Sequence, residues 1–297
     1  MEIILLDDRP NEERPFQIRQ GHHTARNVVE GDPSRTDNFS MRIAYVDSSF
    51  GSNRHHHNFD QWRYVIDGEA DYDNSGKMAA GTLGYFPEGA YYAENGGGPR
   101  TIAIVQFGGP SGWGYFKPHQ LQESFDALSR TGVFEKGIYK RNPGVPGKPM
   151  QDSYEAMWEH KFQREAVYPE PQYSTPIIMN TANYPWVPVE GTPGVDEKAL
   201  GVFTHCKIRA SRYKLEPGAQ FTATGRGIYL VLSGTGMVGD GKYGELTTLY
   251  LGNGEKAALH ADTVTEVLLM GLPDSELILK QATPPAARER ERVWPDN

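Results

Sequence analysis

Cysteine is the scarcest chemically informative residue in this chain. Cys206 is the only one among 297 residues, so neither an intrachain disulfide nor a zinc site built from several cysteines can form. A lone cysteine of this kind most often packs as a small apolar side chain. We therefore expect Cys206 to be buried, and a reducing compartment fits the sequence better than an oxidising one.

Long apolar runs and dense basic runs are also missing. No apolar stretch approaches the length that crosses a bilayer, and residues 1–10 lack the basic and apolar regions of a signal peptide. Acidic residues outnumber basic ones by 38 to 30, which gives little electrostatic support for binding nucleic acid or anionic membranes. We expect a cytoplasmic protein with no nucleic-acid or membrane partner.

Turn-forming residues are abundant. The chain has 33 glycines and 21 prolines, about 18% of the total against roughly 12% in average usage. Short segments rich in β-branched and aromatic residues alternate with turns over 41–107 and again from about residue 200. The intervening region differs, because 119–130 and 152–162 have helical spacing and prolines are frequent around them. An all-β protein with a partly helical connector is predicted.

The two β regions match each other at a nearly constant offset. Residues 64–68 (YVIDG) correspond to 230–234 (LVLSG), and 85–89 (YFPEG) correspond to 250–254 (YLGNG). Unrelated turn-rich stretches have no reason to keep such spacing. The sequence thus predicts two copies of one β domain, with an N-terminal barrel at 1–115, a connector at 116–195, a C-terminal barrel at 196–283 and a charged tail at 284–297.

The densest group of potential metal ligands is His55-His56-His57 with Gln61. Alternate residues of a β-strand point to the same side, so His55 and His57 can face one interior while His56 points away. Neutral imidazole binds Fe, Mn, Co, Ni, Cu or Zn. Two imidazoles provide half of a metal site.

This stretch resembles the cupin superfamily. His55-x-His57, three residues, Gln61, six residues and Gly68 reproduce the spacing of the first cupin motif. Gly81, five residues, Pro87-x-Gly89, two residues and Tyr92 follow the second. The resemblance implies two jelly-roll barrels (double-stranded β-helices), that is, a bicupin, together with a metal site. The family's glutamate position holds Gln61, and its third histidine position holds Tyr92.

The resemblance implies that His55, His57, Gln61 and Tyr92 hold a divalent transition metal, with Fe(II) the leading candidate and Mn, Co, Ni, Cu or Zn as others. An amide contributes only a dipole where a carboxylate contributes charge, so Gln61 should weaken the site. Tyr92 can coordinate as phenolate or remain a proton donor beside the substrate. In a metal-free alternative, Gln61 and Tyr92 hydrogen-bond the two imidazoles within a polar cavity.

Strand parity extends this set. Arg63 shares the parity of Gln61 and can reach the cavity, where a guanidinium can hold a substrate carboxylate. Trp62 and Tyr64 have the opposite parity, which favours packing between sheets or at a dimer face. The equivalent positions of the second repeat hold residues that cannot ligate a metal, namely Phe221, Ala223, Gly227 and Ala257. The second barrel is therefore predicted to be structural.

Three functions follow from these observations. The leading one is a cupin oxidoreductase of the dioxygenase type that acts on a small organic acid or phenol, with Tyr92 and Arg63 assisting the metal. The second is a cupin isomerase or lyase that moves a proton next to a carbonyl. The third is a metal-free cupin that binds a small ligand without catalysis. Fold-level analogy adds the expectation of a homodimer.

Overall fold

The computed structural model describes residues 1–13, 19–35, 37–73, 76–94, 97–109 and 115–277. The predicted charged tail, 284–297, lies outside these ranges. Within them, no helix combines the length and the apolar character that crossing a membrane requires. The secondary structure is dominated by strands, as the composition predicts.

The first large sheet contains most of the strands that the sequence places in the N-terminal half. Its antiparallel order is β15 (Ile177–Asn180), β9 (Thr82–Phe86), β6 (Asp60–Asp67), β11 (Arg100–Phe107), β4 (Phe39–Val46), β3 (His23–Glu30) and β2 (Glu12–Glu13). Two short pairs pack over one face of this sheet: β5 (Ser52–His55) with β10 (Tyr92–Glu94), and β7 (Glu69–Asp71) with β8 (Lys77–Ala79). The cavity described below lies between the large sheet and the pair β5–β10.

The second large sheet repeats this arrangement. Its order is β1 (Glu2–Ile4), β23 (Thr248–Leu251), β20 (Gly227–Ser233), β25 (Thr265–Gly271), β18 (Ile208–Leu215), β17 (Val195–Phe203) and β16 (Val187–Pro188). A smaller sheet packs over it, with the order β19 (Gln220–Thr224), β24 (Lys256–Ala261), β21 (Gly236–Val238) and β22 (Gly241–Tyr243). The central order β23-β20-β25-β18-β17 corresponds to β9-β6-β11-β4-β3, which matches the repeat offset in the sequence.

The jelly-roll class is confirmed, but the expected closure into barrels is not. Each large sheet is open within the described residues, because no pairing joins its two edge strands. The edges explain this: β2 and β16 have two residues each, and Pro188 in β16 lacks the amide hydrogen that a further pairing needs. Each fold unit is thus a sandwich of a large sheet and smaller ones.

Strand exchange blurs the predicted domain boundaries. β1, at the start of the chain, pairs with β23 of the second large sheet, although 1–115 is predicted to form the first barrel. β15, within the predicted connector, pairs with β9 of the first. The two strands occupy corresponding edges of the two sheets. The division of the chain into four segments stays a prediction.

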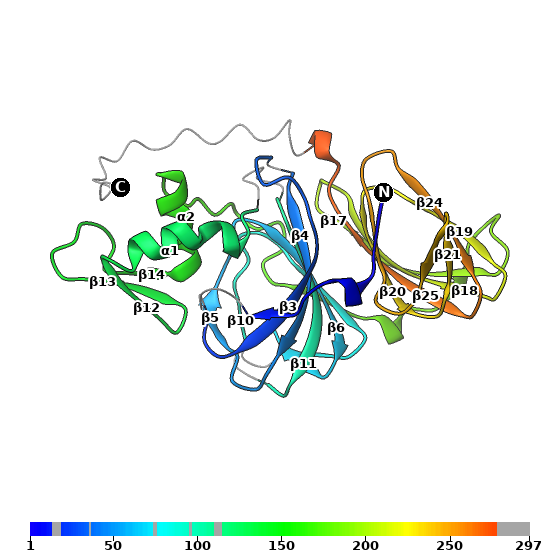
Figure 1. Ribbon diagram of the computed structural model, residues 1–297, viewed down its shortest axis with the longest axis horizontal. Helices are drawn as coiled ribbons and strands as arrows, with labels where there is room; N and C mark the ends of the chain where they lie inside the picture. Colours follow the sequence, from blue (N-terminus) through cyan, green and yellow to red (C-terminus); the bar gives the residue numbers. More distant parts are fainter. Residues whose placement is uncertain (14–18, 36, 74–75, 95–96, 110–114, 278–297) are drawn as a thin grey trace.

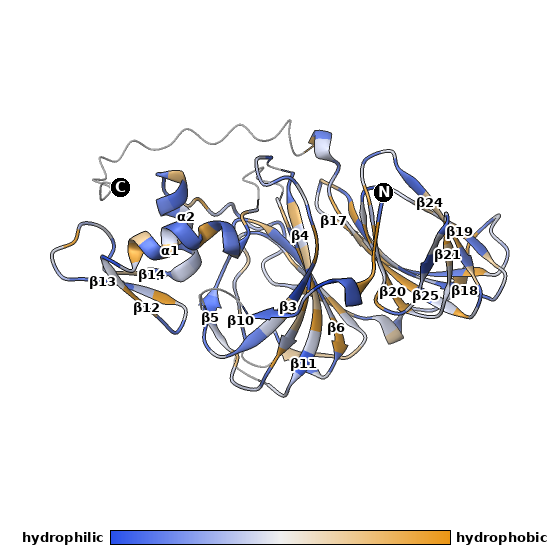
Figure 2. Ribbon diagram, viewed as in Figure 1, coloured by the Kyte–Doolittle hydropathy of each residue, from blue (hydrophilic) through white to orange (hydrophobic). Residues whose placement is uncertain are grey.

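The two large sheets share one apolar core. Along β6, Trp62 and Tyr64 point into this core, and the indole Nε1 of Trp62 donates to the carbonyl of Gly271 on β25 at 2.7 Å. Met270 and Cys206 are buried in the same cluster, which confirms the expected burial of the cysteine. Figure 2 shows this apolar character along β6, β20 and β25. The prediction that Trp62 and Tyr64 pack between sheets is confirmed.

The connector is more structured than its prolines suggest. The predicted helices correspond to α1 (Gln122–Leu128), preceded by a 3-10 turn (Pro118–Leu121), and to α2 (Ser153–Phe162). Asp152 caps α2 by accepting hydrogen bonds from the backbone amides of Tyr154 and Glu155 at 2.8 and 3.2 Å. A three-stranded sheet that the sequence did not predict joins them, with the order β12 (Gly132–Glu135), β13 (Ile138–Arg141) and β14 (Met150–Asp152). Together these elements cover the end of the first sandwich near β5 and β10 (Figure 1).

Candidate functional site

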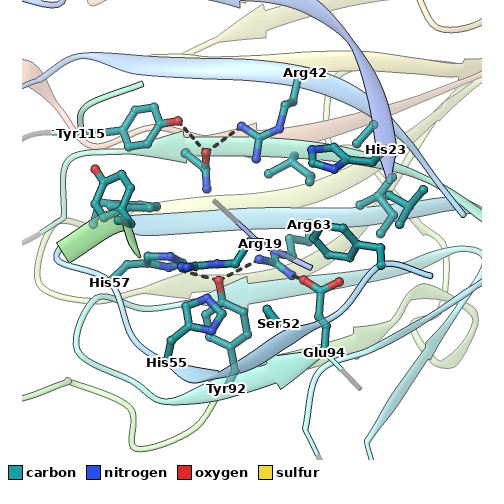
Figure 3. Close-up of a pocket in the computed structure, with 18 residues that line it drawn as sticks. Arg19, His23, Arg42, Ser52, His55, His57, Arg63, Tyr92, Glu94 and Tyr115 are labelled. Carbon is teal, nitrogen blue, oxygen red and sulfur yellow. Dashed lines mark hydrogen bonds and ion pairs between the residues drawn. The ribbon is translucent and has the colours of Figure 1, made fainter. Parts of the chain in front are cut away.

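A cavity of about 80 Å³ lies inside the first sandwich, between the large sheet and the pair β5–β10 (Figure 3). An ordered water needs roughly 10–15 Å³ of such space, so the cavity accommodates a ligand of only a few non-hydrogen atoms. Its walls combine three guanidinium groups, three histidines and a strip of apolar side chains. The apolar strip consists of Ala44, Val46, Phe50, Phe59, Ile102 and Ile104.

Alternate side chains of the large sheet face the cavity, and those between them face the shared core. On β4, Phe39, Met41 and Ile43 point into the shared core, whereas Arg42 and Ala44 line the cavity. β6 and β11 alternate in the same way, so that Arg63 and Gln106 line the cavity. Gln61 lies behind the lining and hydrogen-bonds to His57 and Gln106, which belong to it. The predicted shared face of Gln61 and Arg63 is present, since Arg63 Nη2 lies 3.2 Å from Gln61 Oε1.

Two of the three histidines, His55 and His57, enter the cavity from one short segment, whereas His23 lines it from β3. His55 ends β5, and His57 follows in the loop, where its carbonyl accepts a 2.8 Å hydrogen bond from the amide of Gly89. The two imidazole centroids are 4.7 Å apart. Tyr92 on β10 pairs in register with His55, with ring centroids 4.5 Å apart. The predicted set of His55, His57, Gln61 and Tyr92 is therefore brought together.

His56 points away from the cavity, as strand alternation predicts. Its ring stacks between those of Tyr91 and Tyr168, with centroid separations of 4.1 and 3.7 Å. The segment thus anchors its middle histidine in an aromatic stack outside the cavity and presents the outer two inside it.

His55 has one nitrogen free for a ligand. Its Nδ1 lies 2.6 Å from the carbonyl oxygen of Asn53, and a carbonyl only accepts, so Nδ1 carries the proton. The lone pair is then on Nε2. Burial lowers the pKa of both His55 and His57 well below the usual value, and the positive charge of Arg63 lowers it further. Both imidazoles are neutral at pH 7, which is the form that binds metals.

A chain of two amide side chains, Gln106 and Gln61, links Arg42 to His57. Arg42 Nη1 and the hydroxyl of Tyr115 donate to Gln106 Oε1 at 2.7 and 2.6 Å. An arginine has no acceptor, so the oxygen of Gln106 must face it and its Nε2 must face Gln61. That Nε2 donates to Gln61 Oε1 at 2.9 Å.

The orientation of Gln61 follows from this chain. Its oxygen accepts from Gln106 and Arg63, so its Nε2 faces Tyr92 and His57, at 2.9 Å from the phenol oxygen and 2.9 Å from Nδ1. An amide nitrogen only donates, which makes Nδ1 of His57 an acceptor and places its proton on Nε2. The hydroxyl of Tyr92 lies 3.1 Å from the same Nδ1.

Arg63 is engaged by a buried carboxylate. Its Nη1 donates to Glu94 on β10, and Arg100 Nη2 lies 3.1 Å from the second oxygen of Glu94. Burial alone would raise the pKa of Glu94, but the two guanidinium groups outweigh it and lower that pKa. Arg63 Nη2 also donates to the phenol oxygen of Tyr92 at 2.8 Å. The pKa of Tyr92 is raised by burial in spite of Arg63, so its phenol is protonated.

The sequence did not predict several of the residues that line the cavity. Glu94, Gln106, Tyr115 and Tyr154 lie outside the two motifs, and Tyr154 comes from α2 in the connector. Arg42 carried a usable signal, because it is the only charged residue in the otherwise apolar stretch 41–46. A charge at a strand position that faces an interior points to a ligand or a buried partner.

The donor set for a metal is neutral. Among the residues that the structure describes, no three His, Cys, Asp or Glu side chains cluster as a metal site would require. Nε2 of His55 fits a divalent transition metal directly. Coordination by Nε2 of His57 requires its proton to move to Nδ1 and the amide of Gln61 to turn over, so that its oxygen accepts that proton. The imidazole pair fits such an ion, and the set lacks the carboxylate that strengthens binding.

The corresponding region of the second sandwich is apolar. Phe221, Ala223 and Ala257, which occupy the ligand positions in the repeat, are buried in a cluster with Tyr229 and Leu259. Gly227 begins β20. The described side chains of this interior thus form a packed core.

Comparisons with known proteins confirm the fold. No family model and no curated protein matches the chain. Among solved structures, a Nostoc punctiforme protein with a provisional assignment as a dioxygenase matches with a TM-score of 0.61 at 12% identity, over 92% of this chain and 82% of the other. A mutant of Bacillus subtilis oxalate decarboxylase gives 0.52 at 16%, over 92% and 77%. The nickel(II) complex of an Escherichia coli pirin gives 0.50 at 12%, over 92% and 99%. The chain has the cupin fold that its two motifs predict.

Proposed function

We propose that this chain, with its cupin fold, is a metal-dependent enzyme of the dioxygenase type that acts on a small organic acid or phenol. The observation that carries the proposal is the cavity itself, where two neutral histidines, a protonated tyrosine and an arginine line a space large enough only for a small molecule. The similarity to a provisionally assigned dioxygenase supports the reaction type.

The histidine pair supports a divalent metal. His55 and His57 would hold it, with Tyr92 as a further neutral ligand, and Gln61 would join them only if its amide turned its oxygen away from Gln106 and Arg63. Fe(II) is the proposed ion. Among proteins of similar fold, oxalate decarboxylase contains Mn(II) and the pirin binds nickel(II). When bound, such an ion supplies redox and Lewis-acid chemistry at the polar end of the cavity.

The protein's own groups have distinct roles in this proposal. Tyr92 is protonated and lines the cavity, so it can donate a proton to a substrate oxygen. Arg63 donates to the phenol oxygen and pairs with Glu94, which positions Tyr92 within the cavity. The apolar strip excludes water from the body of the ligand.

A second function, proton transfer by an isomerase or lyase, is favoured by one contact. The hydroxyl of Tyr92 lies 3.1 Å from Nδ1 of His57, within the range in which a proton passes between an acid and a base. In this mechanism the phenol of Tyr92 would give its proton to one atom of the substrate, and His57 would take a proton from the neighbouring atom and pass it to the Tyr92 oxygen across this contact, which regenerates both groups.

Oxygen consumption separates these functions. Purified protein loaded with Fe(II) would be mixed with a panel of glyoxylate, oxalate, pyruvate and catechol in an oxygen electrode, with deuterium exchange followed by NMR. The proposal predicts substrate-dependent oxygen uptake that Tyr92→Phe lowers. Exchange or decarboxylation without oxygen uptake would establish the second function. Ligand binding with no turnover of any kind, by protein that does not retain Fe(II), would identify a metal-free binding protein and overturn both.

A further inference from the structure

The cavity has a second polar end, opposite His55 and His57. Figure 3 shows Arg42 and Tyr115 on one side of the cavity and His55, His57 and Tyr92 on the other. Arg42 projects from the middle of β4, a strand flanked on both sides by β3 and β11. Its position is therefore set by two ladders of backbone hydrogen bonds.

The charges around the cavity are not balanced. Arg19, Arg42 and Arg63 line it, whereas Glu94 is the only acidic residue among the lining residues that the structure describes. Arg63 is paired with Glu94, and Arg19 is paired with Asp152 at 2.8 Å. No carboxylate of the described residues lies within ion-pair distance of Arg42, which leaves one positive charge without a counterion.

The hydrogen bonds of Arg42 are also incomplete. A guanidinium has five donor hydrogens, and the one side-chain acceptor that Arg42 contacts in the described residues is Gln106 Oε1. Its Nε is buried without a partner there. The group loses hydration without receiving full compensation, and burial accordingly lowers the pKa of Arg42 from its usual value. Arginine nevertheless stays protonated in proteins.

An uncompensated charge in an interior is costly, and a bound anion removes the cost. The planar fork of a guanidinium matches a carboxylate, which accepts two parallel hydrogen bonds. The hydroxyl of Tyr115, 2.6 Å from the acceptor that Arg42 uses, lies beside the same position. The small size of the cavity and its apolar strip favour a short carbon chain next to that carboxylate.

We propose that Arg42 binds the carboxylate of a small monocarboxylate or dicarboxylate ligand, with the rest of the ligand extending along the apolar strip toward His57 and Tyr92. This inference rests on the proposed function and specifies its substrate class. It assigns the carboxylate to Arg42 instead of Arg63, because Arg63 already forms an ion pair with Glu94 and Arg42 forms none within the described residues. Arg42 is thereby a specificity-determining residue that contacts the substrate.

Isothermal titration calorimetry on the metal-free protein tests this assignment without any turnover. The titrants are acetate, propionate, pyruvate and oxalate, with acetamide as a neutral analogue of acetate and inorganic phosphate as a tetrahedral anion. We expect at least one carboxylate to bind to the wild type, and Arg42→Met to weaken that binding at least about tenfold. Arg54→Met, which removes an exposed arginine outside the cavity, should leave it unchanged.

Thermal unfolding supplies a second measurement. Because Arg42→Met replaces an uncompensated charge by an apolar side chain of similar length, the ligand-free variant should melt at the same temperature as the wild type or higher. The carboxylate should then raise the Tm of the wild type and not that of the variant.

Three outcomes overturn the assignment: no carboxylate of the panel binds, carboxylates bind to Arg42→Met as tightly as to the wild type, or phosphate binds more tightly than every carboxylate. The proposed function fails separately. Carboxylate binding that depends on Arg42, without metal uptake or turnover, would contradict the proposed enzyme function and leave the assignment of the carboxylate to Arg42 intact. Turnover with an unchanged KM in Arg42→Met would contradict that assignment and leave the enzyme function intact.

Discussion

At the scale of single residues, the orientation of the Gln61 amide determines how strongly the cavity can bind a divalent metal. Its oxygen accepts from Gln106 and Arg63, and its nitrogen faces His57. The sequence predicts which residues meet here but not the direction of the amide, because that direction follows from Arg42 and Gln106, which lie outside the motifs. A neutral amide held in this orientation offers a cation neither charge nor a free oxygen.

Gln61→Glu should therefore raise the affinity for Fe(II) or Mn(II) by about tenfold or more, since a carboxylate supplies charge and can accept a proton on Nδ1 of His57. Titration with metal-competing chelators measures this affinity. Gln220→Glu, an exposed site on β19, adds the same charge far from the cavity and should leave affinity unchanged. Equal affinities for Gln61→Glu and the wild type would mean that the ligand position is not used.

The two cavity histidines should make the protein sensitive to acid. Burial lowers the pKa of His55 and His57 in the folded state, whereas in the unfolded chain it is about 6.5. Below that pH the unfolded state binds protons that the folded state does not. As the pH decreases below about 6.5, the free energy of unfolding should therefore decrease by up to about 1.4 kcal/mol per pH unit for each imidazole.

Urea unfolding between pH 7 and pH 5 measures this slope. The double variant His55→Gln/His57→Gln should flatten it, while His260→Gln, on an exposed position of β24, should not. An unchanged slope in the double variant would show that other groups cause the acid sensitivity.

At the scale of elements, the turn before β10 holds the histidine loop in place. Gly89 has φ +78°, and a Cβ there would collide with the carbonyl oxygen of Pro169 in the connector. Its amide also donates to His57. The motif spacing predicts a turn at this position, but the close approach of a connector segment eighty residues away depends on tertiary packing.

Gly89→Ala should lower the free energy of unfolding by about 2 kcal/mol or more, through the left-handed backbone and the collision together. Gly144→Ala is the matched control, because Gly144 has φ +82° with open space around it, and it should cost only about 1 kcal/mol. Chemical denaturation compares the two. Equal decreases in the free energy of unfolding for the two variants would mean that the connector shifts at Pro169 and relieves the collision.

At the scale of the whole molecule, two similar sandwiches share one core. The central strand orders of the two large sheets correspond, as the repeat offset in the sequence predicts, and duplication of one β domain stays a prediction. The pairing of β1 with β23 and of β15 with β9 could not be predicted, because a strand of three or four residues has no sequence pattern that indicates its partner strand. The homodimer stays a prediction.

The shared core predicts one cooperative unfolding transition. Met270→Ala, at a fully buried position of β25, should lower the free energy of unfolding by about 2–5 kcal/mol and shift the whole transition. Val202→Ala, at a side chain that is 61% exposed, should change it by less than about 0.5 kcal/mol. Calorimetry that resolves two separate transitions would contradict a common core.

The central claim is that His55 and His57 hold a divalent metal on which turnover depends. Elemental analysis of protein purified without chelators, alongside turnover on the substrate found in the oxygen electrode, tests it most directly. The account predicts close to one metal ion per chain in the wild type, and loss of both metal and turnover in His55→Ala/His57→Ala. Full turnover in the metal-free double variant would contradict it.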